Sequence, residues 1–222
     1  MVREAISRTT VGVLVAIVVV GAVSGLYLSG LLTPKPTIVT RSYDDASGDA
    51  YLKDLSVAPG YQDLTRSQIS KQDGRFLFEA VLAQAIPDSP PLVKNESVLE
   101  WFWLLDTDFT SKPVGFPVCS ACSDPPEFDI ALYWNGNSFS ALLVDRRPLL
   151  GGLNATVSPL EFEINGTILK ISVDSAVLGD PGSFRWGVFT EVRYSAPLET
   201  DYWFVDTLPD VAGRLTHPLS WP

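Results

Sequence analysis

Two aspartates separated by a single residue, Asp106 and Asp108, are the side chains whose type and spacing point most directly to chemistry. In an extended backbone, residues i and i+2 face the same side, so the two carboxylates would share one region of space. Like charges that close are unfavourable unless water, donors or a cation neutralise them, and Ca²⁺ prefers carboxylate and carbonyl oxygens. The pair predicts a calcium site with Asp129 and Asp206 as further candidate ligands; the alternative is that both aspartates cap a surface turn.

Aromatic side chains surround this pair in the sequence. Trp101 and Trp103 fall on one face of an extended segment, and Tyr133 and Trp134 end another. Aligned on an exposed sheet face, these four rings would stack against sugar rings, which predicts a ligand-binding platform. The alternative is that they fill the core, where aromatic side chains supply much of the buried area. Because strand side chains alternate between faces, the core is the default interpretation.

The two cysteines, Cys119 and Cys122, lie in a proline-rich stretch between Pro117 and Pro125. Outside a reducing compartment they would close a tight loop as a disulfide. A redox-active pair is the alternative, although such pairs usually lie at a helix N-terminus. A four-cysteine metal site is excluded within this sequence because there is no second pair.

Other chemistries have weaker support. The single histidine, His217, argues against a Ser-His-Asp hydrolase and against histidine-rich metal sites. Paired carboxylates can act as the acid and base of a glycoside hydrolase, which leaves an extracellular enzyme of that kind as a remote alternative. The formal net charge of −10 argues against nucleic-acid binding.

The N-terminal residues 1–32 predict a membrane anchor. The run from Val11 to Leu32 is uncharged and mainly apolar, and as a helix rising about 1.5 Å per residue it is long enough to cross a bilayer. Arg3 and Arg8 precede the run, which predicts a cytoplasmic N-terminus and an external C-terminal part. A cleaved signal peptide ending near Ala22-Val23-Ser24 is the alternative, and both interpretations place the later residues outside the cytoplasm.

The chain after the anchor divides into a linker (33–46), a β domain (47–210) and a C-terminal tail (211–222). The linker carries two prolines and few large apolar side chains. Asn95, Asn154 and Asn165 each begin an Asn-x-Ser/Thr sequence, which predicts a glycoprotein if the source performs this modification.

Short apolar segments separated by turn signals predict an all-β domain. With 17 Pro and 16 Gly the chain is too punctuated for a helical bundle. Hairpin turns are expected at Asn135-Gly136 and Asn165-Gly166. Strands are expected over residues 51–55, 75–86, 98–105, 127–134, 138–144, 160–164, 167–173, 184–194 and 201–210.

Two of these segments, residues 75–86 and 98–105, have features beyond simple alternation. Residues 75–86 also contain good helix formers, so a helix is the alternative there. Residues 98–105 are apolar on both faces apart from Glu100, which predicts a central strand covered on both sides. Antiparallel strands at this spacing predict a two-sheet β-sandwich of the jelly-roll kind.

The order of the motifs between residues 48 and 210 resembles the DOMON-like β-sandwiches, the group that includes family-nine carbohydrate-binding modules. The motifs are an Asp-Gly turn before Phe76–Glu79, the aromatic strand ending in Asp106-Thr107-Asp108, Phe128-Asp129-Ile130 before an Asn-Gly hairpin, Leu178-Gly179 with Gly182-Ser183-Phe184, and Asp206–Asp210. The resemblance implies a secreted or surface-anchored sandwich that binds sugar, haem or calcium. Haem-binding members use axial Met or His, which this chain does not match, because Met1 is its only Met and His217 lies outside the domain.

Together these features predict a membrane-anchored, non-catalytic module that binds a glycan or a neighbouring surface protein, with membrane lipid around its N-terminal helix. An accessory subunit of a membrane complex is the alternative. Small residues such as Gly21 and Gly25 would let a partner helix approach the anchor closely.

Overall fold

The computed structural model describes residues 38–92, 96–108, 126–194, 202–208 and 219–222. The chain divides into two compact units, residues 1–37 and 38–222, and every described residue belongs to the second. Among the described residues there is no helix with the length and apolar character needed to span a membrane. The apolar run from Val11 to Leu32 lies outside these ranges, so its membrane role stays a prediction.

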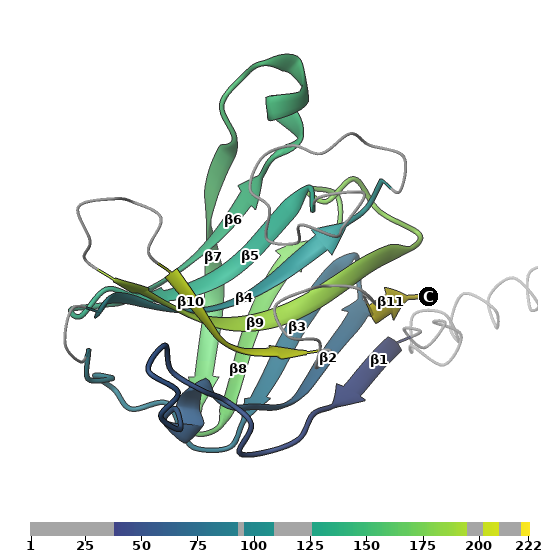
Figure 1. The fold of residues 1–222 in the computed structure, drawn as a ribbon. Helices are drawn as coiled ribbons and strands as arrows, with labels where there is room; N and C mark the ends of the chain where they lie inside the picture. Colours follow the sequence, from purple (N-terminus) through teal and green to yellow (C-terminus); the bar gives the residue numbers. More distant parts are fainter. Residues whose placement is uncertain (1–37, 93–95, 109–125, 195–201, 209–218) are drawn as a thin grey trace, which may run out of the picture. The chain divides into compact units, whose positions relative to one another are not determined.

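Antiparallel strands build the second unit, and two short 3-10 helices, η1 (Gly60–Gln62) and η2 (Arg147–Gly151), interrupt them. The strands are β1 (Val39–Asp44), β2 (Leu64–Gln72), β3 (Arg75–Leu82), β4 (Glu96–Asp106), β5 (Phe128–Trp134), β6 (Phe139–Asp145), β7 (Thr156–Asn165), β8 (Ile168–Asp174), β9 (Phe184–Tyr194), β10 (Tyr202–Leu208) and β11 (Leu219–Trp221). Their order across the sheet is β1-β2-β3-β8-β7-β6-β5-β4-β9-β10, and β11 also pairs with β9 (Figure 1). The prediction of an all-β antiparallel domain is confirmed.

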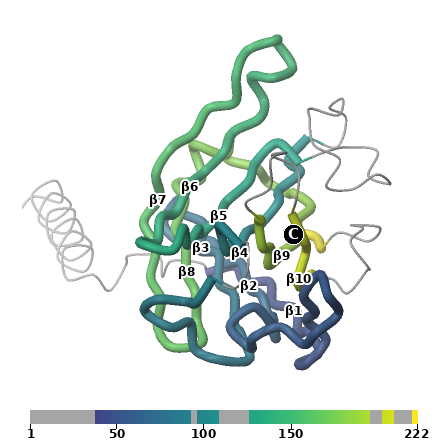
Figure 2. Tube along the Cα trace, turned by 60° about the vertical axis from the view of Figure 1, so that its left-hand side comes forward, coloured from purple at the N-terminus to yellow at the C-terminus, as the bar shows by residue number. Residues whose placement is uncertain are grey.

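The two separate sheets expected from the sequence are one continuous, strongly curled sheet. The first half of β7 (Thr156–Leu160) pairs with β6, and its second half (Glu161–Asn165) pairs with β8. A single strand therefore joins the two halves of the sheet, which curl so that their inner faces enclose one core (Figure 2). Turn signals and apolar alternation predict where strands lie in the sequence. They do not predict that one strand pairs with two different partners along its length.

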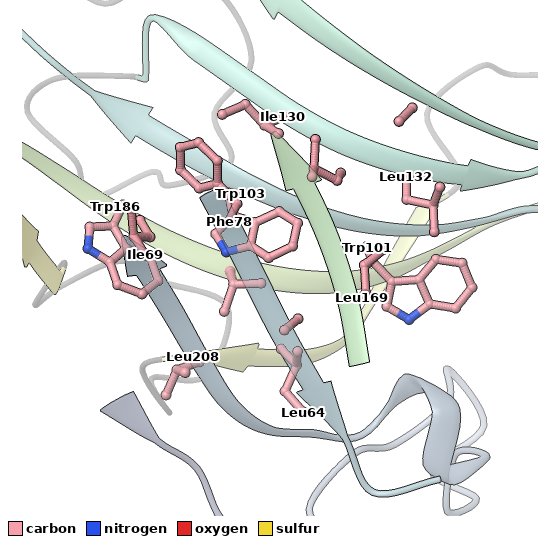
Figure 3. Close-up of a cluster of buried hydrophobic side chains, with 14 of the residues drawn as sticks. Leu64, Ile69, Phe78, Trp101, Trp103, Ile130, Leu132, Leu169, Trp186 and Leu208 are labelled. Atoms are coloured by element: carbon pink, nitrogen blue, oxygen red, sulfur yellow. The ribbon is translucent and has the colours of Figure 1, made fainter. Parts of the chain in front are cut away.

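The core lies between the two halves of the curled sheet. Figure 3 shows side chains of β2, β3 and β8 facing those of β4, β5 and β9. Phe78 of β3 packs against Trp103 of β4 with ring centroids 5.9 Å apart. β4 is also buried on its other face, where Phe102 and Leu104 join a smaller apolar cluster, so its predicted central position is confirmed.

Most predicted strands are present, and residues 75–82 form β3 rather than a helix. Both Asn-Gly turns connect neighbouring strands as expected, with Gly136 and Gly166 at positive φ. Residues 51–55 are not a strand, because Tyr51 makes only an isolated bridge to Val57.

Three strands were not predicted: β1, β2 and β11. β1 occupies residues 39–44 of the expected linker, so the covalent tether before the sheet is shorter than the sequence indicates. β2 has few large apolar side chains, yet it lies between β1 and β3 and buries Leu64, Ser67 and Ile69. Residues 219–221 of the expected tail form β11 against β9.

Candidate cation site

Three aspartates from distant parts of the sequence converge in the described part of the chain. Asp49, Asp63 and Asp206 each contribute one carboxylate oxygen, and these three atoms lie within 4.8 Å of one another. Asp63 and Asp206 are buried, with exposed fractions of 5% and 6%, and Asp49 is half-buried. Together these three residues form a buried acidic cluster that could hold a metal ion.

Local backbone features aim the three side chains at one another. Asp63 directly follows η1 and precedes β2, and Asp49 lies in the loop between β1 and η1. Asp206 follows a β-bulge, because the register with β9 shifts between Phe204 and Asp206. A bulge inserts a residue that re-aims the side chains beside it. The backbone N–H of Tyr51 donates to the carbonyl oxygen of Val205 at 3.0 Å, which holds the Asp49 loop against the bulge.

The hydrogen bonds of the cluster do not reach every buried carboxylate oxygen. The oxygens of Asp206 accept the backbone N–H groups of Leu64 (2.6 Å) and Thr207 (2.7 Å). Asp63 Oδ2 accepts the backbone N–H of Gly48 (2.7 Å) and the hydroxyl of Ser47 (3.4 Å). Asp63 Oδ1 is buried and has no hydrogen-bond partner. A buried, unsatisfied carboxylate oxygen is costly, which favours a ligand for it.

The electrostatics of the cluster favour either a proton or a cation. Burial raises the pKa of Asp206 to about 7, the two backbone hydrogen bonds lower it, and the neighbouring carboxylates of Asp49 and Asp63 raise it further. A divalent cation would replace that proton and neutralise the like charges. The donor set consists of oxygens, which suits Ca²⁺ or Mg²⁺ rather than Zn²⁺.

The structure does not bring the predicted metal ligands together. Asp106 is paired with Arg185 of β9, whose Nε donates at 2.7 Å, and Asp129 is paired with Arg146, whose Nε donates at 3.0 Å. Asp108 lies beyond the end of β4 and is exposed. Arginines thus supply a counter-charge to the two buried members, Asp106 and Asp129, and a cation at Asp106, Asp108 and Asp129 stays a prediction. The cation candidate moves to the Asp49–Asp63–Asp206 cluster.

Three of the four rings in the predicted aromatic platform belong to the core. Trp101 and Trp103 are fully buried, and their indole N–H groups donate to Tyr61 O (2.8 Å) and Ser67 Oγ (3.0 Å) (Figure 3). Trp134 is buried too. Tyr133 points to the opposite face, where it is half-buried beside Glu100. These four rings therefore do not share one exposed face of the sheet, and their role in ligand binding stays a prediction.

The opposite face of β4 and β9 carries a second set of buried charges. Glu100 and Glu191 lie directly across from each other on these strands. Arg193 donates to both, from Nη2 to Glu100 at 2.6 Å and from Nε to Glu191 at 2.9 Å. Burial raises the pKa of Glu100 to about 8, Arg193 lowers it, and Glu191 raises it again. These three residues are called the Glu–Arg cluster below.

Two further predictions meet the structure only in part. Cys119 and Cys122 lie outside the described residues, so their disulfide stays a prediction. Asn95 lies outside them as well. Asn154 and Asn165 are exposed, as an acceptor for glycosylation must be.

Two of the three residues in the acidic cluster escaped the sequence analysis. Asp206 was named as a candidate ligand, whereas Asp49 and Asp63 belong to a stretch with no periodic pattern. The pairing of β10 with β9 and the loop contact to Val205 bring the three together. No local signal in the sequence reports such a convergence.

Comparisons of the chain with protein-family models, with curated proteins and with solved structures give no match. The resemblance to the DOMON-like sandwiches therefore stays a prediction. Any functional assignment depends on the sequence and on the geometry above.

Proposed function

We propose that this protein is a non-catalytic binding or assembly module, held at a membrane by its N-terminal apolar run and stabilised by Ca²⁺ at the acidic cluster. The ligand of the module would be a glycan or a neighbouring surface protein. Its β domain would lie outside the cytoplasm. One observation carries the calcium part of the proposal: Asp63 Oδ1 is buried without a partner within a cluster of three carboxylates.

The external location suits the proposed cation. Extracellular calcium sites work at millimolar concentrations and tolerate modest affinity. A site with three carboxylates, two of them held by backbone N–H groups, provides charge and rigidity. The net charge of −10 also favours divalent cations over anionic ligands.

The alternative is an accessory subunit whose apolar run packs in a membrane complex. The small residues Gly21 and Gly25 in that run support it. Replacement of both by Leu would abolish co-purification with fixed partners if the protein is such a subunit, and would leave a glycan-binding module intact.

A calcium titration tests the main proposal. The full chain in detergent is unfolded by heat, followed by tryptophan fluorescence, in EDTA and in increasing Ca²⁺. A ligand that binds only the folded state at 100 times its dissociation constant stabilises that state by about 2.7 kcal/mol. We therefore expect the melting temperature to rise with Ca²⁺, and Asp63→Asn to abolish the rise.

Asp73→Asn is the matched control. Asp73 is exposed in the β2–β3 turn at φ 51°, a conformation that Asn also adopts readily. This variant removes the same charge from the chain and should respond to Ca²⁺ as the unchanged protein does. A melting temperature indifferent to Ca²⁺ in the unchanged protein would exclude the calcium site.

A further inference from the structure

We propose that the arm between β6 and β7 contacts the lipid bilayer through its exposed leucines. The arm comprises residues 146–155 and projects from the sheet (Figures 1 and 2). Within the arm, Leu150 and Leu153 are 51% and 68% exposed. The proposal rests on the membrane anchoring proposed above.

The arm is an ordered structure that holds its leucines outward. Within it, the backbone N–H of Gly152 donates to Leu149 O at 3.0 Å, and that of Leu153 donates to Pro148 O at 3.1 Å. Gly152 adopts the left-handed conformation, at φ 74°, that closes η2. These backbone hydrogen bonds hold the turn in a conformation that leaves both leucines exposed.

Arg147 fixes the base of the arm. Its guanidinium donates to Asp145 at 2.7 Å and to the carbonyl oxygen of Val177 at 3.2 Å. It also lies over the ring of Phe128, 4.4 Å from the centroid. The arm is therefore joined to the β8–β9 turn, and the exposed side chain of Val177 lies on the element it contacts.

Exposed apolar side chains are concentrated at the end of the sheet where the chain enters from the N-terminal unit. We call this the tether end of the sheet. Val39, the first residue of β1, pairs there with Lys71, next to the β2–β3 turn, and the loop of residues 45–63 lies at the opposite end. Of the nine exposed large apolar side chains in the described residues, five lie at the tether end: Ile38, Leu150, Leu153, Val157 and Val177. Isolated exposed apolar residues are ordinary, but a concentration of them marks an interaction surface.

Chain length favours a bilayer as the partner. Six residue steps separate Leu32, the last residue of the apolar run, from Ile38, so the tether spans at most about 21 Å. If the run is embedded, Ile38 cannot move farther than this from the bilayer. The tether end carries acidic side chains, among them Asp73 and Asp174, and basic ones, among them Lys71, Arg75 and Arg147. With both signs present, the attraction to the bilayer would be mainly hydrophobic.

A depth-sensitive probe tests the inference in the full chain. A fluorescent amino acid replaces Leu150, or in a second variant Leu153, in protein reconstituted into phosphatidylcholine vesicles that contain a lipid-borne quencher. Leu55 is the matched control, because it is 75% exposed in the loop at the opposite end. We expect quenching several-fold stronger at 150 and 153 than at 55, and unchanged by added salt.

The outcomes separate this inference from the proposed function. Protein that does not float with the vesicles would show that the anchor fails. Protein that floats but is quenched equally at 150, 153 and 55 would overturn the arm contact alone. Quenching that salt abolishes, or cross-linking from position 150 to a second copy of the chain without quenching, would also overturn it.

Discussion

Two sets of buried carboxylates lie on opposite faces of the β9–β10 half of the sheet, and they are neutralised in different ways. In the Glu–Arg cluster, the guanidinium of Arg193 bonds to both Glu100 and Glu191. In the acidic cluster, the described partners of Asp63 and Asp206 are backbone N–H groups and one hydroxyl. Burial raises the pKa of a carboxyl in each set, to about 8 for Glu100 and about 7 for Asp206.

The two clusters differ in where the positive charge that offsets their carboxylates comes from. Arg193 is part of the chain and keeps its charge at every relevant pH, so the Glu–Arg cluster has an internal positive charge beside its two carboxyl groups. The described partners of Asp63 and Asp206 carry no charge, so under the calcium proposal we expect a proton or Ca²⁺ from solution to neutralise the acidic cluster and its contribution to stability to change with pH and with Ca²⁺.

The largest effect is expected from removing the internal counter-charge. Arg193→Met keeps an apolar stem of similar length but leaves Glu100 and Glu191, which are 4% and 6% exposed, without their guanidinium. Breaking a buried ion pair typically costs about 3–5 kcal/mol, and we expect the lower end here because the Arg193 side chain is itself 49% exposed. Urea unfolding at pH 7 measures this loss.

Ca²⁺ and pH provide the controls for that variant. Its calcium response should equal that of the unchanged protein, because the acidic cluster is intact. Its destabilisation should shrink as the pH falls and the two glutamates take up protons. A variant as stable as the unchanged protein at pH 7 would show that the Glu–Arg cluster does not depend on its arginine.

The sequence predicted the apolar strands of this fold better than its charges. Alternation and Asn-Gly turns identify β5, β6 and β8, because those patterns report burial on one face and local turn geometry. Counter-charges are tertiary: Arg193 is 93 residues from Glu100 and Leu64 is 142 residues from Asp206, so no local pattern links them. The spacing of Asp106 and Asp108 in the sequence therefore could not show that Arg185 pairs with Asp106.

The stabilisation by Ca²⁺ is expected to depend on pH through Asp206. The pKa of Asp206 is raised in the folded state, so without a cation this group destabilises the fold increasingly as pH rises from about 4 to about 7. Bound Ca²⁺ would displace the proton and remove that penalty. One fully displaced proton changes the stabilisation by about 1.4 kcal/mol per pH unit. Because Asp206 is partly deprotonated near pH 7, the stabilisation by Ca²⁺ should grow by about 2 kcal/mol between pH 5 and pH 7.

Melting curves with EDTA and with saturating Ca²⁺ at each pH measure this growth. Raised pKa values in the Glu–Arg cluster change both curves equally and cancel in the difference. A calcium effect of the same size at pH 5 and pH 7 would contradict competition between the cation and a proton at Asp206.

A smaller effect with the opposite sign is expected when a charge leaves the acidic cluster. In Asp63→Asn, the amide oxygen can accept the Gly48 N–H, and the amide nitrogen can occupy the place of the unpartnered Oδ1. The substitution replaces a like-charge contact by a hydrogen-bond donor. In EDTA at pH 8 we expect a gain of about 1 kcal/mol in unfolding free energy.

Asp63→Ala is the control for that gain, because it removes the charge but also the acceptor of the Gly48 N–H. It should lie below Asp63→Asn in stability. If Asp63→Asn is less stable than the unchanged protein in EDTA, the cluster already has a counter-charge of its own, and the contrast with the Glu–Arg cluster disappears.

The smallest effect is expected at an ion pair that water can reach. Lys170 of β8 lies directly across from Glu79 of β3, with Nζ 3.5 Å from the carboxylate and 32% of the lysine side chain exposed. Lys170→Met keeps the apolar stem and removes the charge, and it should cost about 0.5 kcal/mol or less, because solvent screens the pair and hydrates Glu79 once it is alone. Urea unfolding beside Arg193→Met compares the two directly. If both variants lose the same stability, pairing rather than burial determines the strength of these contacts; a large gap between them would assign the difference to burial.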